Sequence, residues 1–234
     1  MEVGRLIGVV GARGGVGASS LAAALARRLA RRSGSAALVD LDGSSGGIDV
    51  LLGVESADGL RWPDLTDARG EVSGPELTAL LPRWEGVTVL SADRAWPGPA
   101  ADDVEAAVLD ALSSCHGQVV LDLDRSRALD PAGVVGRCAT ALIVASRDVR
   151  SVAGVLAVRT SLVAQSPDVR LVVRGPSPGG LGVLELAHVV DLPVAASMRA
   201  QRGFDAALER GGGPVPRRRG SFARAVAELA SSLA

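Results

Sequence analysis

The 234-residue sequence predicts an α/β fold: a three-layer sandwich whose mainly parallel sheet of about seven strands has helices on both faces. Two observations support this prediction. Short apolar segments alternate with longer segments of helical periodicity along the whole chain. The apolar segments are nearly continuous, which is typical of strands that are buried on both faces. With 47% hydrophobic and 22% charged residues, the chain can bury one sizeable core.

The expected strands are the apolar segments Arg5–Val10, Ala36–Leu41, Val87–Ser91, Gln118–Leu123, Ala141–Ala145, Arg170–Val173 and Val194–Ala196. The first helix is expected from about Ala18 to Arg32, because Leu21, Leu25 and Leu29 recur every four residues and form one apolar stripe. Its arginines lie mostly off that stripe, either on a solvated face or on a contact surface for acidic lipid or DNA. The later helices are expected at Ala101–Ser114, Ser151–Gln165, Leu181–Val190, Ala200–Arg210 and Ser221–Leu233.

A glycine-rich loop joins the first expected strand to the first helix, with the sequence Gly11-Ala12-Arg13-Gly14-Gly15-Val16-Gly17-Ala18-Ser19-Ser20. Successive glycines let backbone N–H groups surround a phosphate, the helix N-terminus adds positive charge, and the Ser19 hydroxyl can ligate Mg²⁺. Phosphate-binding loops of this type have a lysine where this chain has Ala18. All 25 basic residues are arginine, so no other lysine replaces it. The sequence therefore predicts a phosphate cradle that lacks its cation.

Two acidic motifs support a nucleotide site. One expected strand ends in the pair Asp40 and Asp42, and a later strand ends at Asp122 in the pattern of a Walker B aspartate. Alone, each aspartate could equally cap a helix or form a turn. The carboxyl ends of parallel strands meet at one edge of a sheet, so the loop and the aspartates can surround one Mg²⁺–phosphate group. Together they predict a P-loop NTPase sandwich.

Charge and cysteine content exclude some classes of protein. The net charge of −1 argues against a protein that coats nucleic acid by bulk electrostatics. Cys115 and Cys138 lie far apart and outside any CxxC pattern, so no iron–sulfur or zinc site is expected. The N-terminus shows no signal-peptide pattern, and no segment approaches the ~20 apolar residues of a spanning helix. We expect a cytoplasmic chain, with peripheral contact at the inner face of the plasma membrane left open.

These motifs resemble the MinD/ParA group of deviant Walker A ATPases. The segment from Arg13 to Ser19 resembles their KGGxGK[ST] loop, with Arg13 at the signature lysine. Segments 39–53 and 144–152 also resemble the group, and the loop is most similar to the CpaE/TadZ branch, which includes CpaE-like septum-site-determining proteins of high-GC bacteria. Residues 1–234 are interpreted as one such domain. The receiver-like N-terminal domain common in that branch is not expected, because Arg13 lies twelve residues after Met1.

The resemblance implies the cofactors ATP or ADP and Mg²⁺, and a role for each site residue. The implied nucleotide-binding residues are Gly14, Gly15, Val16, Gly17, Ala18, Ser19 and Ser20. The implied metal-site residues are Ser19, Asp40 and Asp122. For catalysis, Asp42 would orient the attacking water and Arg13 would reach across a nucleotide-sandwiched homodimer. Arg174 stands where many relatives have the asparagine that reads adenine, so the base selectivity is left open.

The resulting hypothesis is a dimerising ATP-binding switch that helps position septum, pilus or secretion machinery at the cytoplasmic membrane. Hydrolysis is expected to be weak or absent, because losing one charge-stabilising donor slows catalysis by about 10²–10³-fold. The alternatives are an active ParA-like ATPase acting on DNA and a scaffold that binds no nucleotide; DNA binding is not expected. The C-terminal apolar stripe Phe222, Val226, Leu229 and Leu233 is interpreted as packing onto the sheet, with membrane insertion as the alternative.

Overall fold

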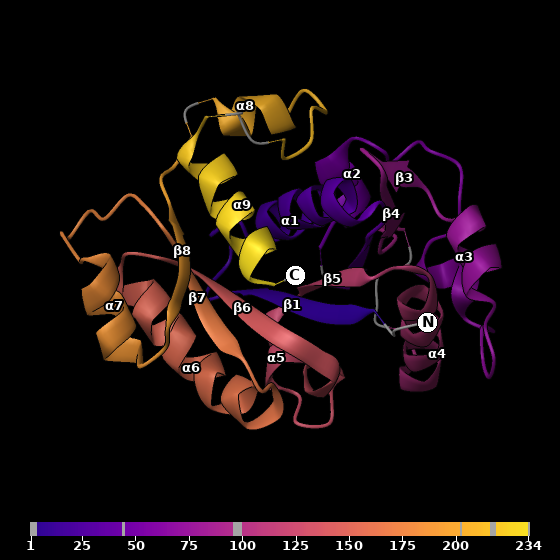
Figure 1. The fold of residues 1–234 in the computed structure, drawn as a ribbon, viewed down its shortest axis with the longest axis horizontal. Helices are drawn as coiled ribbons and strands as arrows, with labels where there is room; N and C mark the ends of the chain where they lie inside the picture. The colour runs from indigo at the N-terminus through magenta and orange to yellow at the C-terminus, as the bar shows by residue number, and fades with distance from the viewer. Residues whose placement is uncertain (1–3, 44, 96–99, 202, 216–218, 234) are drawn as a thin grey trace.

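A computed structural model describes residues 4–43, 45–95, 100–201, 203–215 and 219–233 (Figure 1). They form one eight-stranded sheet in the order β3-β4-β2-β5-β1-β6-β7-β8. The strands are β1 Arg5–Gly11, β2 Ala37–Leu41, β3 Arg83–Trp84, β4 Val87–Leu90, β5 Gln118–Leu123, β6 Cys138–Ser146, β7 Val169–Arg174 and β8 Val194–Met198. All neighbouring strands are parallel except β3 and β4, which pair antiparallel. The predicted α/β class with a mainly parallel sheet is confirmed.

The helices connect these strands across both faces of the sheet. They are α1 Ala18–Ser33, α2 Ile48–Leu52, α3 Gly74–Leu80, α4 Asp102–Cys115, α5 Arg125–Leu129, α6 Val149–Gln165, α7 Val183–Val190, α8 Phe204–Leu208 and α9 Ser221–Ser232. Two short 3₁₀ helices, η1 Trp62–Leu65 and η2 Val134–Arg137, lie in connections. Among the described helices, none is both long and apolar enough to cross a membrane.

The differences from the predicted elements have local causes. The extra strand β3 has only two residues and is joined to β4 by Glu85 and Gly86, both at positive φ, as in a tight hairpin turn. Helix α6 begins at Val149, earlier than predicted, because the Asp148 carboxylate accepts the N–H of Ser151 (2.8 Å) and caps it. The prediction of a helix over Ala200–Arg210 was wrong in extent. Residue 202 lies outside the described part, and the helix found is α8, which follows Gly203 at φ 72°.

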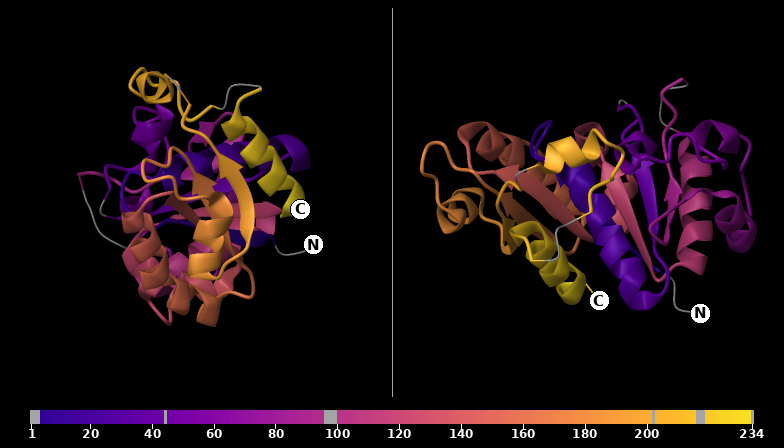
Figure 2. Two further views of the ribbon diagram at one scale, coloured as in Figure 1. Left: turned by 90° about the vertical axis from the view of Figure 1, so that its left-hand side faces the viewer. Right: turned by 90° about the horizontal axis from the view of Figure 1, so that it is seen from above.

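Two apolar layers sandwich the sheet. Residues of α1, α2 and α9 pack on one face, and residues of α4, α6 and α7 pack on the other, where α3 covers α4. Figure 2 shows this arrangement from two further sides. Leu21, Leu25 and Leu29 of α1 are each at most 2% exposed, so the predicted stripe is confirmed as a core face. Off that stripe, Arg27 and Arg31 both contact Glu85 at 3.0 Å.

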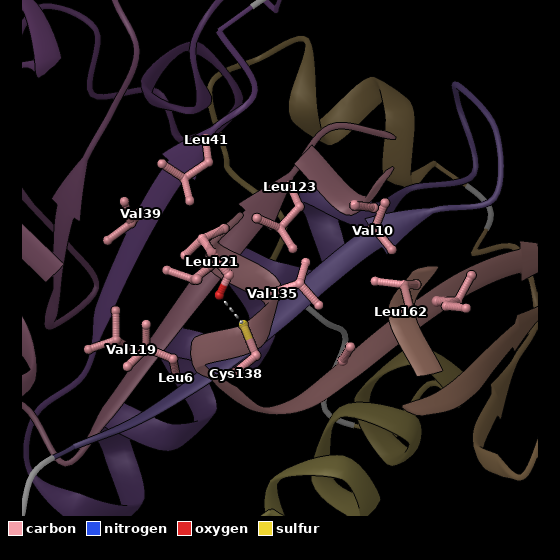
Figure 3. Packing of buried hydrophobic residues seen from close by; sticks show 14 of the residues in the cluster. Leu6, Val10, Val39, Leu41, Val119, Leu121, Leu123, Val135, Cys138 and Leu162 are labelled. Carbon is pink, nitrogen blue, oxygen red and sulfur yellow. Dashed lines mark hydrogen bonds between the residues drawn. The ribbon is translucent and has the colours of Figure 1, made fainter. Parts of the chain in front are cut away.

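The layer beneath α4 to α7 is shown in Figure 3, where side chains from β1, β2 and β5 meet residues near η2. Leu121, Leu123 and Val135 are buried there beside Cys138, whose thiol donates to the Val134 carbonyl (3.6 Å). Burial raises the pKa of this thiol to about 12, so it stays protonated at neutral pH. Cys138 therefore behaves as a core residue.

Helix α9 closes the opposite layer. Its residues Phe222, Val226, Leu229 and Leu233 are each at most 5% exposed and belong to the cluster that contains the α1 leucines. The interpretation of this stripe as a core face is confirmed. Figure 1 shows α9 lying beside α1, near the last strand of the sheet.

Candidate phosphate-binding site

The glycine-rich loop runs from the end of β1 to the start of α1. Gly15 and Gly17 have φ values of 74° and 89°, a left-handed conformation that glycine adopts without strain. Gly17 is also the residue immediately before α1, so the loop ends at the positive pole of a helix. A Cβ at Gly17 would lie 3.0 Å from Nη1 of Arg174, whereas one at Gly14 would meet nothing within 4 Å. The loop thus has the backbone form that binds a phosphate.

The loop borders a hollow of about 320 Å³ at the carboxyl ends of β1, β2 and β5. Its lining residues are Gly11, Arg13, Gly14, Gly15, Val16, Gly17, Ala18, Ser19, Ser20, Asp42, Leu51, Asp122, Leu123, Asp124 and Arg125. The fold therefore brings together all the sequence-predicted site residues except Asp40. Ala18 is the first residue of α1 and contributes no charge.

Asp122 forms the acidic floor of this hollow. It is 4% exposed, lies opposite Asp40 in the pairing of β5 with β2, and receives a hydrogen bond from the Ser19 side chain. Burial, together with the charge of Asp40, raises the pKa of Asp122 to about 8. A bound cation would relieve this cost by stabilising the ionised form. The pair Ser19 and Asp122 therefore has the chemistry of a Mg²⁺ site.

Asp40 lies behind the hollow and holds the loops around it. Its carboxylate accepts backbone N–H groups from Ile48 (2.7 Å), Asp42 (3.0 Å) and Ala92 (3.3 Å). Burial raises its pKa to about 6, with these hydrogen bonds acting in the opposite direction. Its backbone carbonyl also accepts the indole N–H of Trp62 (2.6 Å). Asp40 thus fixes the position of Asp42, which lines the hollow at the end of β2.

Arg13 is held by its own chain. Its guanidinium donates to the Asp148 carboxylate (3.0 Å), the Gly14 carbonyl (3.1 Å) and the Ser146 hydroxyl (3.5 Å). The Arg13 hydrogen bond lowers the pKa of Asp148, so the pair stays ionised at neutral pH. Arg13 therefore connects the glycine-rich loop to Asp148, the residue that caps the N-terminus of α6.

Arg125 is the site residue that the sequence predictions missed. It is the first residue of α5, is exposed, and lines the hollow three residues after Asp122. Within the described part of the chain it has no hydrogen bond or ion pair, whereas the other lining arginine, Arg13, is bound to Asp148. The available signal was a basic residue three positions after Asp122, just beyond the end of the strand that carries this aspartate. Asp124 positions it by capping α5, since its carboxylate accepts the Arg127 N–H (2.8 Å).

A second hollow continues from the same loop and shares Val16, Gly17 and Ser20 with the first. Its open volume is only about 30 Å³, far below the roughly 300–1,000 Å³ of small-molecule sites. Arg174 occupies this region and donates to the Val16 carbonyl (3.0 Å). The other side chains that fill it are those of Met198, Arg199, Gln201, Phe204 and Phe222, the two phenylalanines packing edge to face at 5.4 Å.

Comparison with known proteins gives both sequence relatives and structural neighbours. No protein-family model matches the sequence. An uncharacterized protein of Mycobacterium tuberculosis (strain H37Rv) is 43% identical over 221 residues, which are 92% of this chain and 60% of that protein. The chain thus spans about three fifths of the length of this relative.

Solved structures identify the fold. A ParA family ATPase from Chlorobium tepidum has a TM-score of 0.79 at 16% identity, covering 99% of both chains. The MinD cell division protein of Aquifex aeolicus has a TM-score of 0.78 at 18% identity, covering 98% of this chain and 96% of its own. The chain has the MinD/ParA ATPase fold. The septum site-determining protein MinD of Pyrococcus horikoshii, solved with Mg-ADP, has this MinD/ParA fold at a TM-score of 0.70 and 18% identity, covering 98% and 95%.

Proposed function

We propose that this protein is a MinD/ParA-family switch of the CpaE/TadZ type. It binds Mg-ATP or Mg-ADP, dimerises around the nucleotide, and hydrolyses ATP slowly or not at all. The observation that supports this most directly is the intact phosphate cradle, with Gly15 and Gly17 at positive φ, above a floor that pairs Ser19 with Asp122. The MinD neighbour that binds Mg-ADP supports the same ligand for this fold.

The residues of the larger hollow fit a Mg²⁺–phosphate group. Backbone N–H groups of the loop and the helix terminus would bind the phosphates, while Ser19 and Asp122 would hold the metal through oxygen. Bound Mg²⁺ would neutralise phosphate charge. The smaller hollow, as Arg174 fills it, does not fit a purine base. Affinity is therefore expected to come mainly from the phosphates.

Catalysis is expected to be weak because no lysine lies at position 18. Phosphoryl transfer needs positive charge where negative charge accumulates, and Ala18 supplies none. Arg125 is the lining cation free to approach the phosphates, but it approaches from the end of β5 and not from the loop. We infer that Arg125 supplies part of the phosphate-binding energy that a loop lysine would give. It does not place the positive charge where hydrolysis requires it. Asp42 would orient water in whatever hydrolysis remains.

Dimerisation is proposed to involve Arg13. Its guanidinium lies at the start of α6, where Val149 is 83% exposed, and it lines the hollow edge. In the dimer, Arg13 would release Asp148 and contact the phosphate oxygens of a nucleotide bound by the second copy. This exchange would make dimerisation depend on the bound nucleotide. A dimer of this kind would act on septum, pilus or secretion machinery at the cytoplasmic membrane, as a protein of the cytoplasm with peripheral membrane contact.

The test measures Mg-ATP and Mg-ADP affinity by calorimetry, ATP turnover, and mass in solution with a non-hydrolysable ATP analogue, for the wild type and for Ala18→Lys. We expect saturable binding, a nucleotide-dependent dimer, and very slow turnover that rises by about 10²–10³-fold in the lysine variant. No saturable binding would favour a nucleotide-free scaffold. Fast wild-type turnover together with salt-sensitive duplex DNA binding would favour the active ParA-like alternative.

A further inference from the structure

Strand β8 forms one edge of the sheet and pairs only with β7 among the described strands. The left view of Figure 2 shows β8 at the front of the molecule, between α7 and α9. Such an edge presents N–H and C=O groups to which another extended chain can pair. The strand itself is Val-Ala-Ala-Ser-Met, without the charged or proline residues that commonly protect an edge.

The direction of the backbone shows where this edge is open. The Met198 carbonyl accepts the Gly175 N–H (2.8 Å), so the backbone of Met198 faces β7. Because successive residues of a strand face opposite sides, the N–H and C=O of Ser197 face away from β7. Arg199, the next outward-facing residue, already pairs with the Ser221 hydroxyl through its N–H (2.9 Å). The open part of the edge therefore centres on Ser197, which is exposed.

A hollow of about 520 Å³ lies beside Ser197. Its lining residues are Arg147, Val173, Gly175, Val183, Ser197, Met198, Arg199, Ser221, Arg224 and Glu228. The three arginines come from the end of β6, the end of β8 and the α9 surface. Within the described residues none of them pairs with a carboxylate, and Glu228 is the one acidic group of the lining. Guanidinium groups without a carboxylate partner around a roomy hollow favour an anionic ligand.

We propose that this hollow binds an acidic peptide segment in extended conformation, which adds to the edge of β8. The peptide backbone would pair with Ser197, its carboxylates would contact Arg199 and Arg224, and an apolar side chain would contact Val183, which is partly exposed. A peptide fits better than a free phosphate or nucleic acid, because the site offers backbone donors and acceptors and apolar surface together with positive charge. This partner surface is independent of the nucleotide proposed for the loop.

The experiment measures fluorescence anisotropy of the full chain with a labelled octapeptide of alternating glutamate and valine. Three further ligands are measured for comparison: the same peptide with N-methyl groups on alternate residues, a peptide of alternating lysine and valine, and a short duplex DNA. We expect the glutamate peptide to bind, the N-methylated form to bind about tenfold more weakly, and the lysine peptide not to bind. Equal binding of the two glutamate peptides would overturn strand addition, and binding of DNA alone would overturn the peptide as ligand.

The protein variants locate the site. Arg224→Glu is expected to lower the affinity for the glutamate peptide by about tenfold, since it reverses a charge beside the ligand. Arg28→Glu makes the same charge change on the exposed side of α1 and is expected to have no effect. Circular dichroism melts check that both variants fold, and the comparison of native and N-methylated peptides needs no variant. An equal loss of affinity in both variants would place binding elsewhere and overturn the proposal.

Discussion

The two hollows that share Val16, Gly17 and Ser20 differ in what builds them. The larger one is framed by backbone, namely positive-φ glycines, a helix terminus and the ends of parallel strands, and charged side chains such as Asp122 and Arg125 line it. The smaller one is formed by side chains, with Arg174 bonded across it to the Val16 carbonyl. The backbone part has the form that a phosphate needs, while the side-chain part leaves about 30 Å³ of open volume.

A phosphate cradle and a base pocket can therefore change independently of each other. The cradle depends on a chain path that the whole sheet enforces, so replacing one side chain at Ala18 leaves its geometry in place. The base region depends on the volume and charge of a few side chains, so one arginine can fill it. Substitutions in the two hollows should therefore have separable effects on ligand binding.

Gly17→Val should weaken Mg-ATP binding by about a hundredfold, because a β-branched residue at φ 89° is strained and its Cβ meets Arg174. Calorimetry measures the affinity. Gly14→Ala is the matched control, since its Cβ would meet nothing within 4 Å, and it should bind like the wild type. If both variants bound equally well, the backbone of the loop would not be what recognises the ligand.

Arg125→Ala should weaken binding of Mg-ATP by about tenfold, the effect expected from removing a charged hydrogen-bond donor. The salt dependence of the affinity should also become shallower, because one cation near the phosphates is lost. Arg125→Lys, which keeps the charge, should recover part of the affinity. Unchanged affinity in Arg125→Ala, with normal binding by the wild type, would show that the loop binds phosphate without this arginine.

Arg174→Ala should open the smaller hollow. In the wild type, Mg-ATP and inorganic tripolyphosphate should bind with similar affinity, because the base finds no pocket. In the variant, ATP should gain on the order of threefold over tripolyphosphate, a change below 1 kcal/mol. Competition calorimetry with the two ligands measures this ratio. A wild type that already prefers ATP strongly would mean that the base is recognised without displacing Arg174.

Asp122→Asn should stabilise the Mg²⁺-free protein at high pH. The pKa of Asp122 is raised from 3.8 to about 8 by burial, so its stabilising contribution is fully present below pH 3.8 and is lost as the pH rises through 8. Asparagine does not titrate, so the variant should have the higher melting temperature at pH 8.5. Each kcal/mol of difference in the free energy of unfolding should raise the melting temperature by about 2–4 °C. Near pH 4 the two proteins should melt alike. Thermal melts of both proteins in the presence of a chelator, from pH 4 to pH 8.5, measure this effect. A difference in melting temperature that stayed constant with pH would show that titration of the buried Asp122 is not the cause.

Periodicity predicted most of the fold, and loop chemistry predicted a set of site residues most of which the fold brings together around one hollow. Near-continuous apolar segments predicted seven of the eight strands, since strands buried on both faces need apolar residues throughout. The short strand β3, the short helices α2, α3 and α5, and the 3₁₀ helices were missed, because such short segments carry no readable period. The loop motif predicted residues 14–20 as site residues, and all of them line the larger hollow.

The sandwich, the glycine-rich loop and the absence of its lysine can be read from the sequence, because each depends on residue types within short segments. The side chains that surround the loop depend on the three-dimensional fold. It placed Arg125 beside the phosphate cradle, Arg174 across the base region, and Arg13 on Asp148. In each case the residues brought together are more than 100 positions apart in the sequence: Arg125 lines one hollow with Ser19, Arg174 donates to Val16, and Arg13 donates to Asp148. No local pattern encodes them, because the order of the strands in the sheet sets which ends meet.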